Sequence, residues 1–476
     1  MLSDGFLLIG KRDCPTCTLI EPVMRELAGA DADFVVCTQD DPQFPEGIPG
    51  VIDDTQLGIS YRLNIEVVPT LLQIRGGKEV GRVIGWHQGE WRHLTGQGTL
   101  GEGLPESRPG CGSKSVEPGM LETLALRFGD IELNSRRIEI AALEDEHEAC
   151  FDRGWSDGLP VIPPTEARVA RMLGGTTRSP SEVLGRMPPN LVECTVEKVA
   201  VNAVLAGCKP EYLPVVIACV EAVLTDEFCM HGLLATTWFS GPVVVVNGPI
   251  TRAIGMNCEG NALGQGNRAN GTIGRALQLV VRNVGGGRPR EIDRAALGHP
   301  GKYTFCFAED ERDAWLPLAQ ERGVAEGASA VTVFTGDGVQ GIGDQKSRTP
   351  ESLARTFAMS LRNVYHPKSV QASDALLVVS PEHARVFHDA DWSKQDLKKC
   401  LHDLLQIPGH ELVLGANGIS EGLPPSARDK TFAKFRDGGL NIVRAGGGAG
   451  MFSALIGGWP ASGETGSIPV TKEIQL

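Results

Sequence analysis

Apolar and polar residues follow two different periods along residues 1–96. Short apolar runs bounded by polar residues predict buried strands, whereas apolar residues at spacings of three and four predict an amphipathic helix. Two apolar segments joined by Gly76 and Gly77 predict a β-hairpin. The pattern therefore predicts strand, helix, strand, helix, hairpin and helix over residues 5–10, 15–28, 33–38, 55–63, 68–86 and 89–96.

The composition changes after residue 96. Residues 97–119 are rich in glycine, proline and serine, which predicts a linker between two domains. The first domain therefore covers residues 1–96, and a larger domain covers residues 120–476. A length of 476 residues agrees with more than one hydrophobic core.

The larger domain repeats one passage, in which an apolar strand leads into a glycine-rich loop and a helix. Strands that alternate with helices predict an α/β domain with a mostly parallel sheet. The helices predicted at 274–284 and 354–364 share the ending Arg-Asn-Val, which suggests a duplicated unit and two subdomains, about 120–325 and 326–476. The passages begin with the strands in 241–250, 328–344, 374–381 and 440–452.

Charge narrows the kinds of partner that the chain binds. The formal net charge is -14, and no run of lysine and arginine interrupts it, so neither nucleic acid nor an anionic membrane surface is an expected partner. No apolar stretch approaches the roughly 18 residues of a membrane span, and no basic leader precedes the first apolar run. We therefore expect a cytoplasmic protein, in which most of the 12 cysteines are reduced and buried.

Cys14 and Cys17 form a C-x-x-C pair where the first predicted strand leads into the first helix. A thiol at a helix N-terminus faces the positive end of the helix dipole, which favours its thiolate. We expect Cys14 to be an exposed nucleophile and Cys17, one turn later, to be the resolving thiol. The sequence contains no second C-x-x-C and no His-x(3–5)-His, so we expect no structural zinc site.

The strand and helix order, the C-x-x-C after the first strand and Val68-Pro69-Thr70 before the hairpin resemble the thioredoxin fold. The resemblance covers about residues 5–96. It implies a βαβαββα domain in which Pro69 is cis and lies against the cysteine pair, while Val68 offers its backbone to an extended substrate. Two other interpretations stay open: an idle pair in a domain kept for docking, and capture of a metal or metalloid by the pair.

The stretch 257–277 of the larger domain is a candidate anion site. Its glycines let backbone approach a ligand, and the N–H groups at the start of the following helix suit a carboxylate or phosphate. The alternative is a tight crossover in which glycine serves only packing. The candidate residues are Gly264, Gly266, Arg268, Asn270 and Arg275.

Two thiols of the larger domain are candidates for chemistry on a substrate. Cys258 precedes the glycine-rich loop, and Cys306 lies near Glu309 and Asp310. For either thiol the alternative is an inert, buried cysteine. This domain resembles bacterial domains of unknown activity, so no catalytic residue carries over to it.

The fusion of the two domains suggests the function. A tethered redox domain has a high effective concentration at its neighbour. We therefore expect a thiol-dependent oxidoreductase in which Cys14 and Cys17 recycle Cys258 or Cys306, with Cys111 as a candidate relay. The Cys14–Cys17 disulfide is the only redox group expected. The partners are a small anionic or polar substrate and an external thiol or disulfide reductant.

Two alternatives belong to other classes. In a lyase or transferase, the C-x-x-C domain delivers sulfur or captures a soft metal. In a non-enzymatic role, the same domain only docks, and Cys14→Ser leaves function intact. The sequence leaves open whether copies of the chain assemble into a homo-oligomer.

Overall fold

The computed structural model describes residues 4–30, 33–129, 131–141, 143–459 and 466–476. The chain divides into two compact units. The first unit comprises Met1–Glu132 and Glu166–Ala170, and the second comprises Leu133–Thr165 and Arg171–Leu476.

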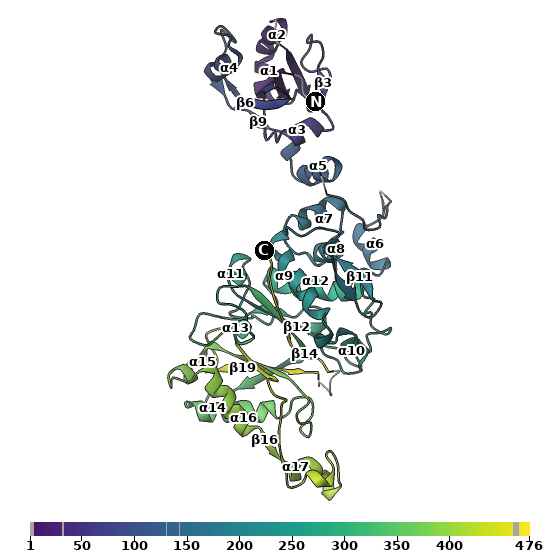
Figure 1. Ribbon diagram of the computed structural model, residues 1–476, viewed down its shortest axis with the longest axis vertical. Coiled ribbons are helices and arrows are strands. Elements are labelled where there is room, and N and C mark those ends of the chain that lie inside the picture. Colours follow the sequence, from purple (N-terminus) through teal and green to yellow (C-terminus); the bar gives the residue numbers. More distant parts are fainter. Residues whose placement is uncertain (1–3, 31–32, 130, 142, 460–465) are drawn as a thin grey trace. The chain divides into compact units, whose positions relative to one another are not determined.

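The first unit is built on a five-stranded sheet in the order β3-β2-β1-β5-β6 (Figure 1). β1 pairs in parallel with β2 and antiparallel with β5, so the α/β class and the predicted order of elements are confirmed. The elements are β1 (Gly5–Gly10), α1 (Pro15–Leu19), α2 (Glu21–Gly29), β2 (Phe34–Thr38), β3 (Ile52–Asp53), α3 (Gly58–Arg62), β4 (Val67–Val68), β5 (Thr70–Arg75), β6 (Lys78–Ile84), β7 (Trp86–His87), α4 (Gln88–Thr95), β8 (Ser107–Arg108), β9 (Cys111–Gly112) and α5 (Met120–Phe128).

The helix predicted over residues 15–28 is divided in two. α1 ends at Leu19, and α2 begins at Glu21 with Pro22 in its first turn. Proline has no N–H to donate to the preceding turn and its ring clashes with that turn, so the helix is interrupted here. The division leaves α1 as a single short turn that carries Cys17.

Residues 97–119, which the composition predicts to be a linker, are instead folded onto the first unit. β8 pairs with β7, and β9 pairs with β4. Leu100 is part of the hydrophobic core, and Trp86 Nε1 donates to Pro105 O over 2.7 Å. The glycines serve tight turns: Gly101 has φ +67°, and a Cβ there would lie 2.5 Å from the Trp86 ring. We call residues 107–113 the strap.

The second unit contains a seven-stranded sheet in the order β13-β12-β14-β19-β15-β18, with β20 also paired to β14 (Figure 1). Its elements are α6 (Glu146–Asp152), α7 (Glu166–Leu173), through which the division into units passes, β10 (Val183–Met187), β11 (Val192–Thr195), α8 (Val196–Ala206), α9 (Leu213–Val223), α10 (Met230–Ala235), β12 (Gly241–Asn247), α11 (Ile250–Ala253), α12 (Arg268–Asn283), β13 (Cys306–Ala308), α13 (Leu318–Glu321), β14 (Ala330–Gly343), α14 (Pro350–Leu361), β15 (Ala375–Val379), α15 (Pro381–His388), α16 (Lys394–Leu404), β16 (Gln406–Pro408), α17 (Gly409–Val413), β17 (Thr431–Ala433), β18 (Leu440–Arg444), β19 (Phe452–Gly458) and β20 (Val470–Glu473).

This sheet is mixed and not mostly parallel, because two inner strands return in the opposite direction. β12 is parallel to β13 and β15 is parallel to β18, but β14 and β19 are antiparallel to their neighbours. The strands thus form two halves of equal topology, β12-β13-β14 and β15-β18-β19. The two helices with the shared ending do not correspond in these halves, since α12 lies between β12 and β13 in the chain, whereas α14 precedes β15.

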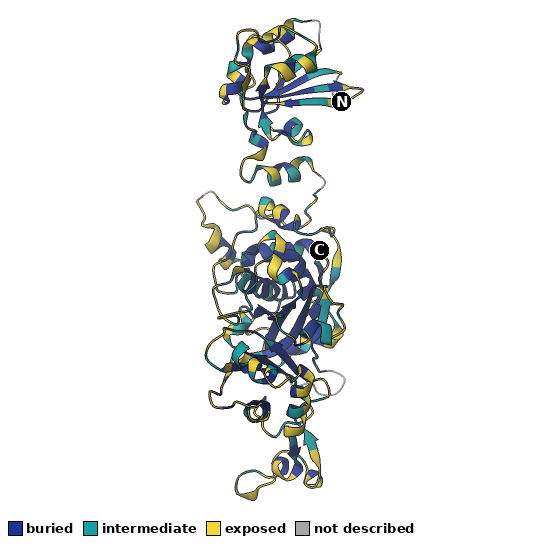
Figure 2. Ribbon diagram, turned by 90° about the vertical axis from the view of Figure 1, so that its left-hand side faces the viewer, coloured by how far each residue is buried: buried dark blue, intermediate teal, exposed yellow. Residues whose placement is uncertain are grey.

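The strands of this sheet are largely buried (Figure 2), apart from the exposed residues 338–341 in the second half of β14. Alternate side chains of all its long strands meet in one cluster, which includes Val245, Phe307 and Val443. The two edge strands approach each other beyond their ends, where Asp310 N donates to Arg444 O over 2.7 Å. The carboxyl ends of β12, β13 and β18 are thereby brought together.

Candidate functional site

Cys14 occupies the N-cap position of α1. Its backbone is extended, and its Sγ accepts a hydrogen bond from Cys17 N over 3.4 Å. Pro15 follows as the first helical residue, where the missing N–H costs no helix hydrogen bond. The sequence around the pair therefore places the Cys14 sulfur against the unpaired N–H groups of a helix start.

Pro69 lies beside this helix start. The Val68–Pro69 peptide bond is cis, as the resemblance implies. The Sγ of Cys14 lies 3.5 Å from Val68 O. The structure thus brings Cys14, Cys17 and Pro69 together in the first unit.

The two thiols of the pair differ in acidity. A hydrogen bond from the Cys17 thiol lowers the pKa of Cys14 to about 5. Burial raises the pKa of Cys17, so this thiol stays protonated and keeps donating at neutral pH. Cys14 is then a thiolate with a protonated neighbour, which is the arrangement that a nucleophile and a resolving thiol require.

Cys14 is not the exposed nucleophile that the sequence predicts, since only 1% of its surface is accessible. The strap lies over β4 and the start of α1: Cys111 pairs with Val68, and Thr16 Oγ1 donates to Pro109 O over 2.7 Å. Cys111 itself is half-buried and packs against the core cluster that contains Cys14. The structure therefore places a third thiol at the pair.

The second unit has a cavity of about 730 Å³ at the carboxyl ends of β12 and β13. It is lined by four carboxylates and two guanidinium groups, with one thiol and two amides. The lining therefore favours a polar or cationic ligand over an anionic one. These side chains are Glu309, Asp310, Glu311, Glu326, Arg252, Arg312, Cys258, Asn247 and Gln320.

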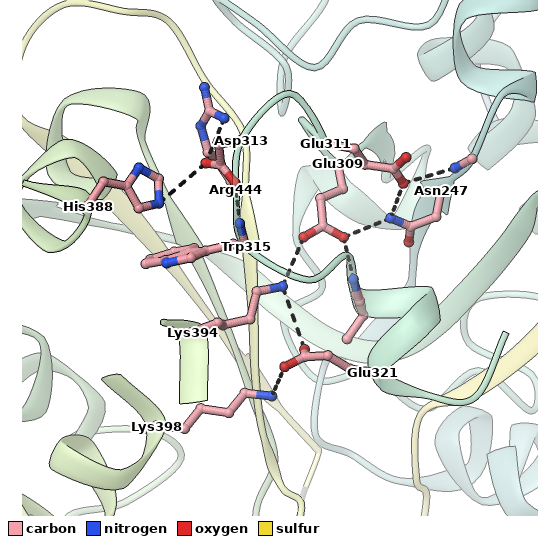
Figure 3. Close-up of polar contacts among 12 residues, drawn as sticks. Asn247, Glu309, Glu311, Asp313, Trp315, Glu321, His388, Lys394, Lys398 and Arg444 are labelled. Atoms are coloured by element: carbon pink, nitrogen blue, oxygen red, sulfur yellow. Dashed lines mark hydrogen bonds and ion pairs between the residues drawn. The ribbon is translucent and has the colours of Figure 1, made fainter. Parts of the chain in front are cut away.

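Glu309 is the buried centre of a polar network at this cavity (Figure 3). Its carboxylate accepts from Asn247 Nδ2 over 2.7 Å and from Leu318 N over 2.7 Å, and Lys394 Nζ lies 3.2 Å away. Burial raises the pKa of Glu309, although Lys394 opposes this effect. The cavity floor thus holds a carboxyl group that is fully hydrogen-bonded and shielded from water.

A second set of ion pairs joins the edge strands at the same end of the sheet (Figure 3). Arg444 binds Asp310 over 3.0 Å and Asp313 over 2.6 Å. Asp310 also binds Arg312, and these partners hold the pKa of Asp310 below its usual range despite its burial. Three of the six charged side chains at the cavity, Glu309, Asp310 and Arg312, are therefore already paired within the protein.

The residues of the predicted anion site are engaged with the protein. Arg275 forms a bidentate ion pair with Asp157, and Arg268 Nε donates to Gly207 O over 3.0 Å. Asn270 is buried, and its side chain bonds both backbone groups of Asn257. An anion at this helix start would have to replace these contacts.

The glycines of this stretch shape the loop before α12. At Gly264 a Cβ would meet the Asn261 side chain at 2.2 Å, and Gly266 has φ +111°. The loop touches the glycine-rich segment after β18, where Gly446 N donates to Cys258 O over 2.9 Å. Two glycine-rich loops that are distant in the sequence therefore meet at Cys258.

The two candidate thiols of the second unit have different surroundings. Cys306 lies on the face of β13 that α12 covers, and burial raises its pKa well above the ordinary value. Cys258 is half-buried and lines the cavity, and burial together with nearby Asp310 raises its pKa. Only Cys258 of the two is accessible to a ligand in the cavity.

Sequence patterns do not single out Asn247 or Lys394 at this cavity. Asn247 is the last residue of an apolar strand, and Lys394 lies at the start of a helix 85 residues beyond Glu309. The acidic run Glu309-Asp310-Glu311, directly after a buried strand, is the one local signal for this end of the sheet. In the described part of the chain, no three or more His, Cys, Asp and Glu side chains are grouped to hold a metal ion.

None of the helices in the described residues combines the length and apolar character that crossing a membrane requires. No protein-family model matches the chain, and no solved structure matches it. Two thioredoxins of Oryza sativa subsp. japonica are similar to part of it. Thioredoxin H2-2 is 33% identical over 72 residues, which is 15% of this chain and 45% of the relative. Thioredoxin H2-1 is 31% identical over 72 residues, 15% of this chain and 44% of the relative.

The chain thus spans less than half the length of the curated relatives that it matches. Besides this sequence similarity, the first unit has the five-stranded sheet and the cysteine pair at the start of α1 that are described above. Likeness and fold together support a thioredoxin-like domain at the amino-terminal end of this chain.

Proposed function

We propose that the first unit is a thiol–disulfide oxidoreductase module. The observation that carries the proposal is the position of Cys14: an N-cap thiol that accepts from Cys17 N and has a pKa lowered to about 5, beside a protonated, buried Cys17. Perturbed thiols of this kind are typical of reactive cysteines and not of structural ones.

The reaction proceeds in two exchanges. The Cys14 thiolate attacks a substrate disulfide, forms a mixed disulfide and releases the first substrate thiolate. Cys17 then loses its proton and attacks the Cys14 sulfur, which releases the second substrate thiol and leaves the Cys14–Cys17 disulfide. Two electrons pass from the pair to the substrate, and an external thiol or reductase returns them. The buried Cys17 ionises only as it attacks, because its thiolate is disfavoured in the apolar core.

The second unit binds the molecule whose thiol chemistry this module supports. The cavity supports this part of the proposal, since its lining combines Cys258 with amide, carboxylate and guanidinium groups and suits a small polar ligand. Cys258, and not the enclosed Cys306, is then the thiol that the pair recycles. A Cys14–Cys258 bond trapped in the Cys17→Ser/Cys111→Ser chain tests this step.

The module is tested by mixing the reduced full-length chain with a small aromatic disulfide whose thiol product is coloured. The wild type is expected to release both halves of the reagent in a fast phase. Cys14→Ser should abolish that phase, and Cys17→Ser/Cys111→Ser should release one half and retain the other as a mixed disulfide. Cys400→Ser is the matched control, because Cys400 is a half-buried thiol of the other unit. A fast phase that persists in Cys14→Ser would refute the proposal.

A further inference from the structure

The strap is fixed to the first unit on both sides of Cys111. Before Cys111, Pro109 O accepts from Thr16 Oγ1 over 2.7 Å. After it, Ser113 N donates to Glu66 O over 2.9 Å, and the Ser113 hydroxyl accepts from Gln39 Nε2 over 2.6 Å. These contacts fix the position of Cys111 in the strap, so its place beside the pair is a built feature of the fold.

Cys111 faces the residue that also touches the nucleophile. It pairs antiparallel with Val68, and Val68 O lies 3.5 Å from Cys14 Sγ. Burial and the nearby Cys14 sulfur raise the pKa of Cys111, and the Cys111 thiol in turn helps to lower the pKa of Cys14. Cys14 therefore has two thiol neighbours, one from its own helix and one from the strap.

The two neighbours differ in access to solvent. Cys17 has no accessible surface, and Cys14 has 1%, whereas Cys111 is partly exposed. A solvent-borne thiol or disulfide thus reaches Cys111 while the strap is in place. A pair that is closed to solvent needs such an outer sulfur, or a displaced strap, to exchange with a substrate.

We propose, on the basis of the redox function proposed above, that Cys111 is a third redox thiol that exchanges with Cys17 as the disulfide partner of Cys14. Starting from the Cys14–Cys17 disulfide, the Cys111 thiolate attacks the Cys14 sulfur. The Cys14–Cys111 bond forms, the Cys14–Cys17 bond breaks, and Cys17 leaves with the proton that Cys111 gave up. The exchange is an isomerisation and needs no external oxidant.

The outer disulfide has a chemical advantage over the inner one. A disulfide opens faster when the leaving thiol is more easily ionised. Both sulfurs of the Cys14–Cys17 bond are enclosed by the core, whereas the Cys111 sulfur of the outer disulfide belongs to a half-buried residue. An external thiol therefore bonds to Cys111, the Cys14–Cys111 bond breaks, and Cys14 leaves as a thiolate, which its lowered pKa favours. A second external thiol then attacks the mixed disulfide and releases Cys111. The strap thiol therefore carries the oxidising equivalent from the buried pair to the surface.

The test uses the full-length Cys17→Ser chain, incubated with glutathione disulfide, quenched with acid and mapped by mass spectrometry. Cys14 is expected to be bonded to Cys111, with no glutathione retained on it. Cys17→Ala serves as a second variant in case Cys17→Ser alters the core. Cys17→Ser/Cys400→Ser is the matched control and should give the same Cys14–Cys111 bond.

Retention of glutathione on Cys14 in Cys17→Ser, with Cys111 still free, would overturn this inference alone. The Cys17→Ser/Cys111→Ser chain separates the two proposals, because Cys14 should then be recovered with glutathione or Cys258 attached. A Cys14 that reacts in neither chain would overturn the inference and the proposed redox function together.

Discussion

At the scale of single residues, the pair is defined by a difference between two identical side chains. Cys14 sits at the start of a helix and is surrounded by donors, whereas Cys17 is enclosed by the core one turn later. Each thiol strengthens the difference, since the protonated one donates to the ionised one. The spacing of the two cysteines defines only the C-x-x-C motif. Their different surroundings make Cys14 the nucleophile and Cys17 the resolving thiol.

We predict that Cys14 ionises with a midpoint near pH 5 in the reduced chain, as its lowered pKa requires. The midpoint is followed by thiolate absorbance in the ultraviolet, as the difference between wild type and Cys14→Ser. Cys17→Ala should raise the midpoint, because the hydrogen bond from Cys17 is the largest cause of the lowered pKa. A midpoint near 9, the ordinary value for a thiol, would contradict the prediction.

The lowered pKa of Cys14 also predicts how the stability of the folded chain changes with pH. The pKa of Cys14 is lower in the folded than in the unfolded chain, so the unfolded chain binds more protons between pH 5 and 9. The reduced wild type should therefore gain stability relative to Cys14→Ser as the pH rises through this window. The contribution is complete above pH 9 and is lost as the pH falls through about 5.

At the scale of elements, the strap controls the access of solvent to the Cys14–Cys17 pair. Its composition resembles a linker because glycine and proline also make the tight turns that fold it back onto β4 and β7. Local pattern predicts the helix start and the hairpin, which depend on neighbouring residues. It cannot predict the burial of Cys14, because the covering strap is distant in the sequence: Thr16 bonds Pro109, which lies 93 residues further along the chain.

Gly110→Ala is predicted to displace the strap, since a Cβ at this position would lie 2.4 Å from Val67 Cγ1 and 2.6 Å from Val68 O. Gly112→Ala is the matched control on the same strap, where a Cβ has no atom within 4 Å. Alkylation of Cys14 by iodoacetamide, followed by peptide mapping, should be faster in Gly110→Ala than in wild type and unchanged in Gly112→Ala. Equal rates in all three chains would show that the strap does not limit access to Cys14.

At the scale of the whole molecule, two units with different sheets share one chain. The α/β class of both could be predicted, because alternating strands and helices leave a strong periodic signal. The direction of β14 and β19 could not be predicted from the sequence. A strand that is buried on both faces is apolar throughout, whether it runs parallel or antiparallel to its neighbours. The cavity could not be predicted from the sequence either, because Asn247, Glu309 and Lys394 come from three distant segments.

The measurement that tests the central claim most directly is a redox titration of the full-length chain. The chain is equilibrated at a series of glutathione to glutathione disulfide ratios, quenched with acid, alkylated and mapped for disulfides. The proposed function predicts that Cys14 enters a disulfide within the first unit reversibly, with Cys17 as its partner. A pair that stays reduced at every ratio, or that is recovered with extra sulfur or a bound metal, would contradict it and favour the lyase or transferase alternative.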